Sequence, residues 1–376
     1  MREVEDVSAD AGAVLARAFE QRDRWTISSA QPLVGIFGNG MPETLVAAAG
    51  AVPVHLSLGF TDDEHPVASV IEPFVDDEVR TFLVRLMNGE FADYRGIIFS
   101  RDDAPALIAY QYATEWIRQG KPRGDTPPLF LWNLVHTDSA PVRAFNAVQA
   151  EKLFAFFASI GLARPDPAAL QRAAADEGRR QAALGDLTAA VGVTVSGAHA
   201  MQWRNAGRFM QAAEHARLLT SALTQGTGTV SAGRRIALVG SPLACPRTYA
   251  VLETFGSIVC DLQPLGSVWP GPGNTSGDLE TILSAAAADA SCPRITPSAA
   301  HRSGIVKSIL DARCDLVVCQ LAQTDDTFGW EVPRLFAELA GHGITCVNLG
   351  FRDPEPPAAW LDRATSIIAQ ALEARP

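Results

Sequence analysis

No cysteine precedes Cys245 in this chain of 376 residues, and none of its six cysteines belongs to a C-x-x-C pair. The spacing therefore gives no sign of a local thiol motif. In a chain of this size we expect six reduced thiols, most of them buried as small apolar side chains.

Long basic runs and long apolar runs are also missing. The net charge is -11 and basic residues cluster only in pairs such as Arg179-Arg180, so nucleic acid is not an expected partner. Residues 1–30 hold no apolar run of the signal-peptide kind, and no later segment approaches the roughly eighteen uncharged apolar residues of a membrane span. We expect a cytoplasmic protein without a membrane segment.

The chain does contain enough apolar sequence for more than one core. Hydrophobic residues make up 47% of it, which is ordinary for a globular protein. A length of 376 residues exceeds what one core usually serves. We therefore expect two domains.

Short apolar segments alternate with helical ones in the first half. The strand candidates are 33–37, 52–56, 96–99 and 129–134, and the main helix candidates are 75–87, 104–119 and 143–159. Such alternation favours a parallel sheet with helices on both faces.

The same alternation resumes after a helical stretch at 165–225 and a glycine-rich entry at 226–233. The later strand candidates are 235–239, 257–260, 316–319 and 345–349, with a helix at 279–288 among those between them. We predict an α/β fold of two α/β/α domains with parallel sheets, Rossmann- or flavodoxin-like, joined by a helical connection. The predicted division is 1–164, 165–233 and 234–376.

Six segments of the chain resemble, in the same order, the cluster-bearing subunits of the 2-hydroxyacyl-CoA dehydratase and benzoyl-CoA reductase family. They are GIFGNGMPETLVAAAGAVPVHL, DYRGIIFSRDDAPALIAYQY, PLFLWNLVHTDSAPVRAF, RRIALVGSPLACPRTYAVLETFGSIVCD, SCPRITPSAAHRSGIVKSILDARCDLVVCQ and LAQTDDTFGWEVPRLFAELAGHGITCVNLGF. Each segment alone is a common strand, turn and helix. The shared order is the more specific signal.

The resemblance implies a [4Fe-4S] cluster held by cysteine thiolates from three loops. The matching positions here are Gly38, Asp102 and Asp325, and none of them is a cysteine. Glycine has no side-chain ligand and carboxylates are hard oxygen donors, so we expect no cluster of the usual kind. A replacement cluster would need Cys245, Cys319 and a third thiol in one cavity.

The family's known activity implies a subunit that binds an acyl-CoA beside a related chain, with an ATP-driven electron-donating activator. Our leading hypothesis is a cluster-less subunit of such a lyase or oxidoreductase complex. It would bind acyl-CoA in the interdomain cleft and pair with a homologous cluster-bearing subunit or with itself. The alternatives are a cluster-free acyl-CoA hydratase, hydrolase or lyase, and a non-catalytic scaffold.

Two groups of residues are candidates for acid-base chemistry. Asp102 and Asp325, each followed by a second aspartate, would face one another if their loops meet as in the family. They could act as acids or bind Mg or Mn, and they could equally cap helices. His136 follows an apolar strand and could be an acid, a base or a structural hydrogen-bond partner.

Two turns are candidates for binding the ligand. The first is Gly38-Asn39-Gly40, which leads into a helix, and the second contains Ser241 and is followed by Arg247. Backbone N-H groups at such a turn suit a phosphate or a thioester oxygen. Among the other histidines we expect His55 in the core and His215 on the surface. No metal site is predicted.

Overall fold

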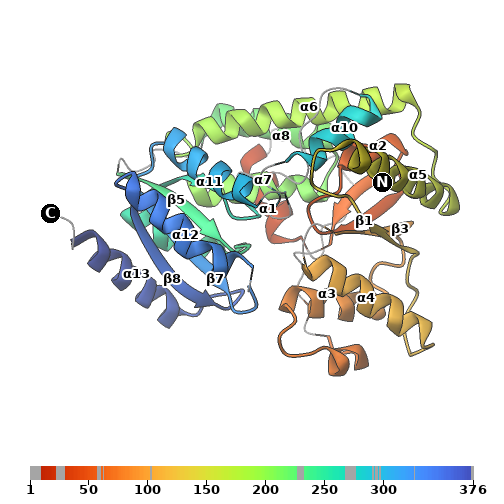
Figure 1. Ribbon diagram of the computed structural model, residues 1–376, viewed down its shortest axis with the longest axis horizontal. Coiled ribbons are helices and arrows are strands. Elements are labelled where there is room, and N and C mark those ends of the chain that lie inside the picture. Colours follow the sequence, from red (N-terminus) through yellow and green to blue (C-terminus); the bar gives the residue numbers. More distant parts are fainter. Residues whose placement is uncertain are drawn as a thin grey trace.

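The computed structural model describes residues 10–22, 30–56, 61, 63–101, 104–226, 233–266, 277–289, 292, 295, 298–325 and 327–373. Within these residues the chain forms two four-stranded parallel sheets, placed side by side and joined by helices (Figure 1). This confirms the predicted α/β fold with two parallel-sheet domains. Asp102 and its neighbour Asp103, as well as Asp326, lie outside the described residues.

The first sheet has the strand order β2-β1-β3-β4. Its strands are β1 (Leu33–Phe37), β2 (Val52–His55), β3 (Gly96–Ser100) and β4 (Leu129–Trp132). Strand β1 is a nearly continuous apolar run, which suits its central position with both faces covered. The predicted strand positions are confirmed to within two residues.

Helices cover both faces of the first sheet. They are α2 (Glu43–Ala48), α3 (Asp77–Met87), α4 (Ala104–Arg118) and α5 (Ala140–Ser159), with the short η1 (Pro66–Val70) before α3. Helices α3 and α4 share a core with Phe37 and Phe99, whereas α2 and α5 share another with Val34 and Ile36. The sheet is therefore buried between two apolar layers.

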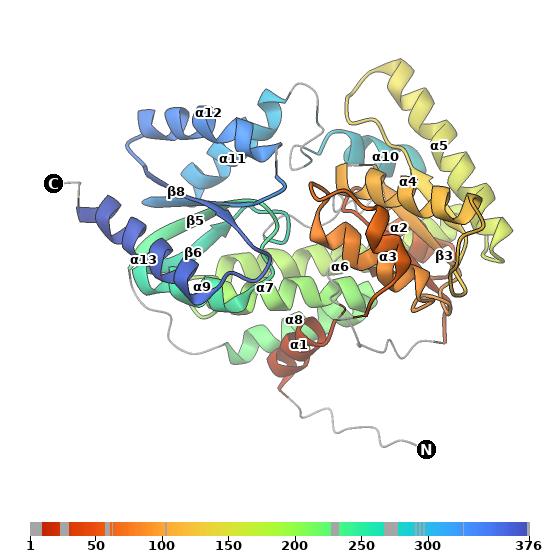
Figure 2. The same ribbon diagram turned by 90° about the horizontal axis from the view of Figure 1, so that it is seen from below.

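The second sheet has the order β6-β5-β7-β8. Its strands are β5 (Arg234–Gly240), β6 (Gly256–Asp261), β7 (Leu316–Ala322) and β8 (Thr345–Arg352). On one face lie α9 (Pro246–Leu252), η3 (Glu253–Phe255) and α13 (Ala358–Glu373), and on the other α11 (Ala299–Asp311) and α12 (Phe328–Gly341). Figure 2 shows the two helical layers above and below this sheet.

A layer of helices joins the two sheets. It contains α1 (Ala11–Glu20), α6 (Pro167–Ala190), α7 (Gly197–Ala206), η2 (Gly207–Phe209) and α8 (Ala212–Gln225). Helix α6 contacts α2 of the first half, and α7 contacts α9 and β6 of the second. The layer therefore packs on both halves.

Helix α10 (Leu279–Ala287) returns to the first half from late in the sequence. Ile282, Leu283 and Ala286 pack in the core that α2 and α5 share, beside α5 in Figure 1. The side chains of α10 therefore cover the first sheet, although the helix lies between β6 and β7 in the sequence. Across the described part of the chain, every helix is too short or too polar to span a bilayer.

Candidate functional site

The turn that follows β1 has a backbone conformation suited to glycine. Gly38 comes directly after Phe37 and has φ of +99°, in the left-handed region that other residues rarely adopt. The turn leads through Asn39 to α2, which begins at Glu43 after Pro42. It stands at the carboxyl edge of the sheet, where α/β proteins place their ligands.

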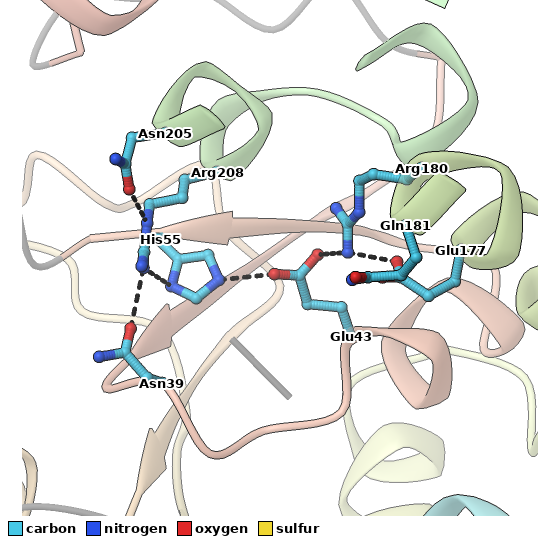
Figure 3. A network of polar contacts seen from close by, with 8 residues as sticks. All are labelled: Asn39, Glu43, His55, Glu177, Arg180, Gln181, Asn205 and Arg208. Carbon is cyan, nitrogen blue, oxygen red and sulfur yellow. Dashed lines mark hydrogen bonds and ion pairs between the residues drawn. The ribbon is translucent and has the colours of Figure 1, made fainter. Parts of the chain in front are cut away.

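A chain of buried polar side chains begins at this turn (Figure 3). Arg208 donates from Nη1 to Oδ1 of Asn39 at 2.9 Å and to Nδ1 of His55 at 3.3 Å. His55 lies at the end of β2 and is 2.8 Å from Glu43 through Nε2. The chain therefore joins the turn, the neighbouring strand end and the first residue of α2.

The same chain continues into α6 through an ion-pair cluster. Arg180 binds Oε2 of Glu43 at 2.8 Å and also binds Glu177, which accepts a further bond from Gln181 at 2.6 Å. Burial opposes the charged form of Glu43, but Arg180 and His55 outweigh it and lower the pKa of Glu43 to about 2. Burial dominates at Glu177 and raises its pKa.

A cavity of about 330 Å3 borders this ion-pair cluster. Glu43, Glu177 and Arg180 are among its lining residues, together with Thr44 and Arg172. It lies between α2, β2, α6 and the start of α8, so it is separate from the turn at Gly38.

The polar chain also reaches the second half of the molecule. Arg208 donates from Nε to Oδ1 of Asn205 at 2.7 Å. Asn205 in turn donates to the carbonyl oxygen of Leu265, after β6, at 2.6 Å. A second contact between the halves joins Thr324, after β7, to Asp76, after β2. The carboxyl edges of the two sheets therefore face each other.

Asp325 and Ser241 lie together at the carboxyl edge of the second sheet. Ser241 donates from Oγ to Oδ2 of Asp325 at 2.5 Å. The other oxygen of Asp325 accepts the backbone N-H groups of Thr327 at 3.1 Å and Phe328 at 2.8 Å. Asp325 therefore caps the start of α12 from two positions before the N-cap residue Thr327, which is the structural alternative that its sequence position left open.

His136 and Arg247 occupy separate places. His136 is buried and its Nδ1 lies 3.2 Å from the carbonyl oxygen of Ala286 at the end of α10. Arg247 is exposed on α9 and donates to the carbonyl of Pro356 at 2.6 Å. Of the candidate residues that the structure describes, Gly38 and Asn39 share one turn, and Ser241 and Asp325 share a contact. Gly40 follows in the first turn.

Sequence reasoning missed most of the buried polar chain and misplaced one histidine. His215 was expected on the surface but is fully buried, with Nε2 2.9 Å from the carbonyl oxygen of Trp203. Burial lowers the pKa of His215 to about 3. Gly207 makes room for the ring, since a Cβ there would come within 2.2 Å of it. His215 lies on α8, which packs against α6 and α1, and these contacts between separate elements have no local sequence signal.

All six cysteines lie in the second half of the chain, and all are thiols rather than disulfides. Cys319 is fully buried in the sheet core, where burial raises its pKa to about 12, and Cys245 stands at the start of α9. Among the described residues, no three His, Cys, Asp or Glu side chains are grouped so that they could hold a metal ion.

The sequence of the chain matches one known protein family. The sequence model of the family described as 2-hydroxyglutaryl-CoA dehydratase, D-component, matches residues 39–353. The chain belongs to this family. No curated protein matches the chain. Family membership identifies it as a component of a 2-hydroxyacyl-CoA dehydratase-like system.

The described side chains do not fit the cluster that the resemblance implies. Gly38 offers no ligand, and both carboxylate oxygens of Asp325 are engaged by Ser241 and the start of α12. Asp102 lies outside the described residues, and its side chain carries oxygen rather than sulfur. Iron in such clusters is normally held by thiolates.

Proposed function

We propose that this chain is a cluster-less component of a 2-hydroxyacyl-CoA dehydratase-like complex that binds an acyl-CoA between its two sheets. The observation that carries the proposal is the pairing of family membership with Gly38 at φ of +99°. The backbone of this turn has a conformation that favours glycine, so the residue at position 38 agrees with the local structure in which a cysteine thiolate would otherwise be expected.

The placement of the ligand rests on the facing carboxyl edges of the two sheets. Loops after β1 and β2 approach loops after β6 and β7 through Arg208 and through the contact of Asp76 with Thr324. Such edges are where parallel sheets bind ligands. Arg101 follows β3 at this edge, is exposed, and donates to Asn133 at 3.0 Å. Its guanidinium supports binding of a CoA phosphate.

A related cluster-bearing subunit is the partner that we propose. The side chain of Trp330 on α12 supports an interface because the residue is 81% exposed, and Phe74 before α3 is 72% exposed. Phe74 lies close in sequence to Asp76, and Trp330 lies close in sequence to Thr324, the two residues whose side chains join the halves. A complex with a second copy of this chain is the competing outcome.

Acid-base catalysis by this chain alone receives less support. Nδ1 of His136 contacts a backbone carbonyl oxygen, and Asp325 caps a helix. Both side chains therefore have structural roles. We therefore place the redox chemistry on the partner and the substrate contacts on this chain.

Thermal unfolding with butyryl-CoA tests the ligand proposal. The melting temperature should rise with the logarithm of butyryl-CoA concentration, because only the folded state binds it. Butyryl-pantetheine, which lacks the nucleotide phosphates, should give a smaller rise. Arg101→Gln should reduce the rise with butyryl-CoA, whereas Arg118→Gln, at an exposed helix end, should not. An unchanged melting temperature at millimolar butyryl-CoA would contradict acyl-CoA binding.

Purification of the tagged chain from its native host tests the partner. We expect a related chain of similar size that carries cysteines at the three loop positions. Recovery of the tagged chain only with copies of itself would favour the homomeric alternative.

A further inference from the structure

The segment from α7 into η2 passes through the joint between the two sheets. Met201 packs in the core of the second sheet, and Phe209 packs in the core of the first. Between them, Asn205 and Arg208 are each only 1% exposed. This short segment therefore connects both cores, and its polar side chains must find partners inside the protein.

Arg208 finds partners in three separate elements. Its Nη1 donates to Asn39 in the turn after β1 and to His55 at the end of β2, and its Nε donates to Asn205 on α7. A guanidinium holds its donors in a rigid planar fork, so it fixes the relative positions of its acceptors.

The contact with Arg208 also fixes the tautomer of His55. Arginine has no acceptor, so Nδ1 of His55 must accept, and Nε2 then carries the hydrogen that is donated to Glu43. Burial lowers the pKa of His55, with Glu43 acting in the opposite direction and Arg208 adding to the lowering. A neutral His55 therefore accepts a hydrogen bond from Arg208 and donates one to Glu43, so it connects Arg208 with the start of α2.

Asn205 anchors this guanidinium to the second half. Its side-chain amide donates to the carbonyl oxygens of Leu265 at 2.6 Å and Met201 at 2.8 Å, while its oxygen accepts from Arg208. None of these three bonds reaches the first sheet directly. The link from Asn205 to the turn at Asn39 runs through Arg208.

We infer that Arg208 is a positioning residue, which holds the Gly38-Asn39-Gly40 turn in register with the second half of the molecule. Through Asn39 it sets one side of the facing sheet edges, and through Asn205 it is held to the other. The inference goes beyond the proposed function because it holds for whatever ligand lies between those edges.

The methionines provide probes at the places that this inference concerns. Met41 is fully buried and lies two positions after Asn39, Met201 and Met210 flank Arg208 along the chain, and Met87 is a distant reference at the end of α3. Their methyl groups can be followed by NMR in the full-length protein labelled with 13C-methyl methionine. No ligand is needed, so failure of acyl-CoA binding would leave the test intact.

The expected pattern separates positioning from local packing. Asn39→Ala and Arg208→Gln should both shift or broaden the Met41 signal and leave Met87 in place. Asn205→Ala should also move Met41, because Arg208 loses its link to the second half. Asn205→Asp keeps the acceptor for Arg208 but loses the amide donor to Leu265, so it should restore the Met41 signal only in part. Arg208→Lys should restore it in part. Arg179→Gln, at an exposed arginine on α6, should change none of these signals.

Two results would overturn the inference. In one, Met41 keeps its wild-type signal in both Asn39→Ala and Arg208→Gln. In the other, Arg208→Gln and Asn205→Ala move Met201 and Met210 alone, which is what a purely local packing role predicts. If Arg208→Gln fails to fold, Asn39→Ala and the pair of Asn205 variants decide the question.

Discussion

Ser241 donates a hydrogen bond from Oγ to Oδ2 of Asp325 at 2.5 Å, although the two residues lie 84 positions apart. Ser241 is buried directly after β5, and its hydroxyl also accepts the backbone N-H of Ala322 at 2.8 Å. Asp325 therefore joins two loops and caps α12 at the same time. The carboxylate at this loop position serves the structure of the second domain.

Asp325→Ala should lower the free energy of unfolding by about 1–2 kcal/mol, because it removes a helix cap and the partner of Ser241. Asp325→Asn should retain most of the stability, since asparagine also caps helices. Urea unfolding measures both. Asp311→Ala, at the exposed end of α11 beside Lys307, is the matched control and should be nearly neutral. Equal losses in the alanine and asparagine variants would contradict the capping role.

Gly38→Cys should destabilise the protein by about 1–3 kcal/mol, because a side chain at positive φ is strained. The control is Gly185→Cys, in α6, where an added Cβ meets nothing within 4 Å. That variant should be neutral or slightly stabilising, since glycine is a poor helix former. Chemical denaturation under reducing conditions compares the two. A Gly38→Cys protein as stable as the control would show that the turn accepts other residues.

Glu43→Gln should cost about 3–5 kcal/mol, because it leaves Arg180 and His55 buried with one carboxylate fewer. Glu115→Gln removes the partner of an exposed arginine on α4 and should leave the free energy of unfolding unchanged. Thermal and urea unfolding of the two variants would test this contrast. Similar stabilities would mean that the ion-pair cluster is as weak as a surface pair.

Asp261 should make stability depend on pH. Burial raises the pKa of Asp261 to about 6, against the opposing effect of the hydrogen bond from Tyr249, which is 2.6 Å long. Because the folded pKa exceeds the unfolded value of 3.8, the folded state holds a proton that the unfolded state has released. This contribution of about 3 kcal/mol is present below pH 3.8 and is lost as the pH rises through 6.

The variant Asp261→Asn isolates this effect, since its amide oxygen can still accept from Tyr249. Unfolding curves should show the wild type losing stability relative to Asp261→Asn between about pH 4 and 6, and a constant difference above about pH 7. Parallel profiles for the two proteins across that window would contradict the raised pKa.

Local sequence patterns were sufficient to predict the strands and most helices. The run at Leu33–Phe37 is apolar and ends at a glycine, and the structure has β1 with these bounds. Likewise the Pro42-Glu43 pair marks the start of α2, because proline suits a first turn and glutamate suits the positive helix end. These features depend on neighbours within a few positions.

The buried polar chain could not be predicted in the same way. Arg180 follows the exposed Arg179, and two adjacent arginines are typical of a surface segment. Arg180 is nevertheless only 1% exposed, because it forms buried ion pairs with Glu43 and Glu177. Arg208 and Asn39 meet across 169 positions. Helix α10 has an ordinary amphipathic sequence that does not reveal which sheet it covers. The burial of Arg180, the contact of Arg208 with Asn39 and the position of α10 all depend on contacts between segments that are distant in the sequence.

Iron and acid-labile sulfide content after anaerobic reconstitution is the most direct test of the central claim. The purified chain would be incubated with ferrous iron and sulfide under reducing conditions and then desalted. We predict that iron and sulfide are removed and that no [4Fe-4S] absorption remains, because Gly38 and Asp325 offer no thiolate. Stoichiometric iron and sulfide with the absorption of a [4Fe-4S] cluster would contradict the account.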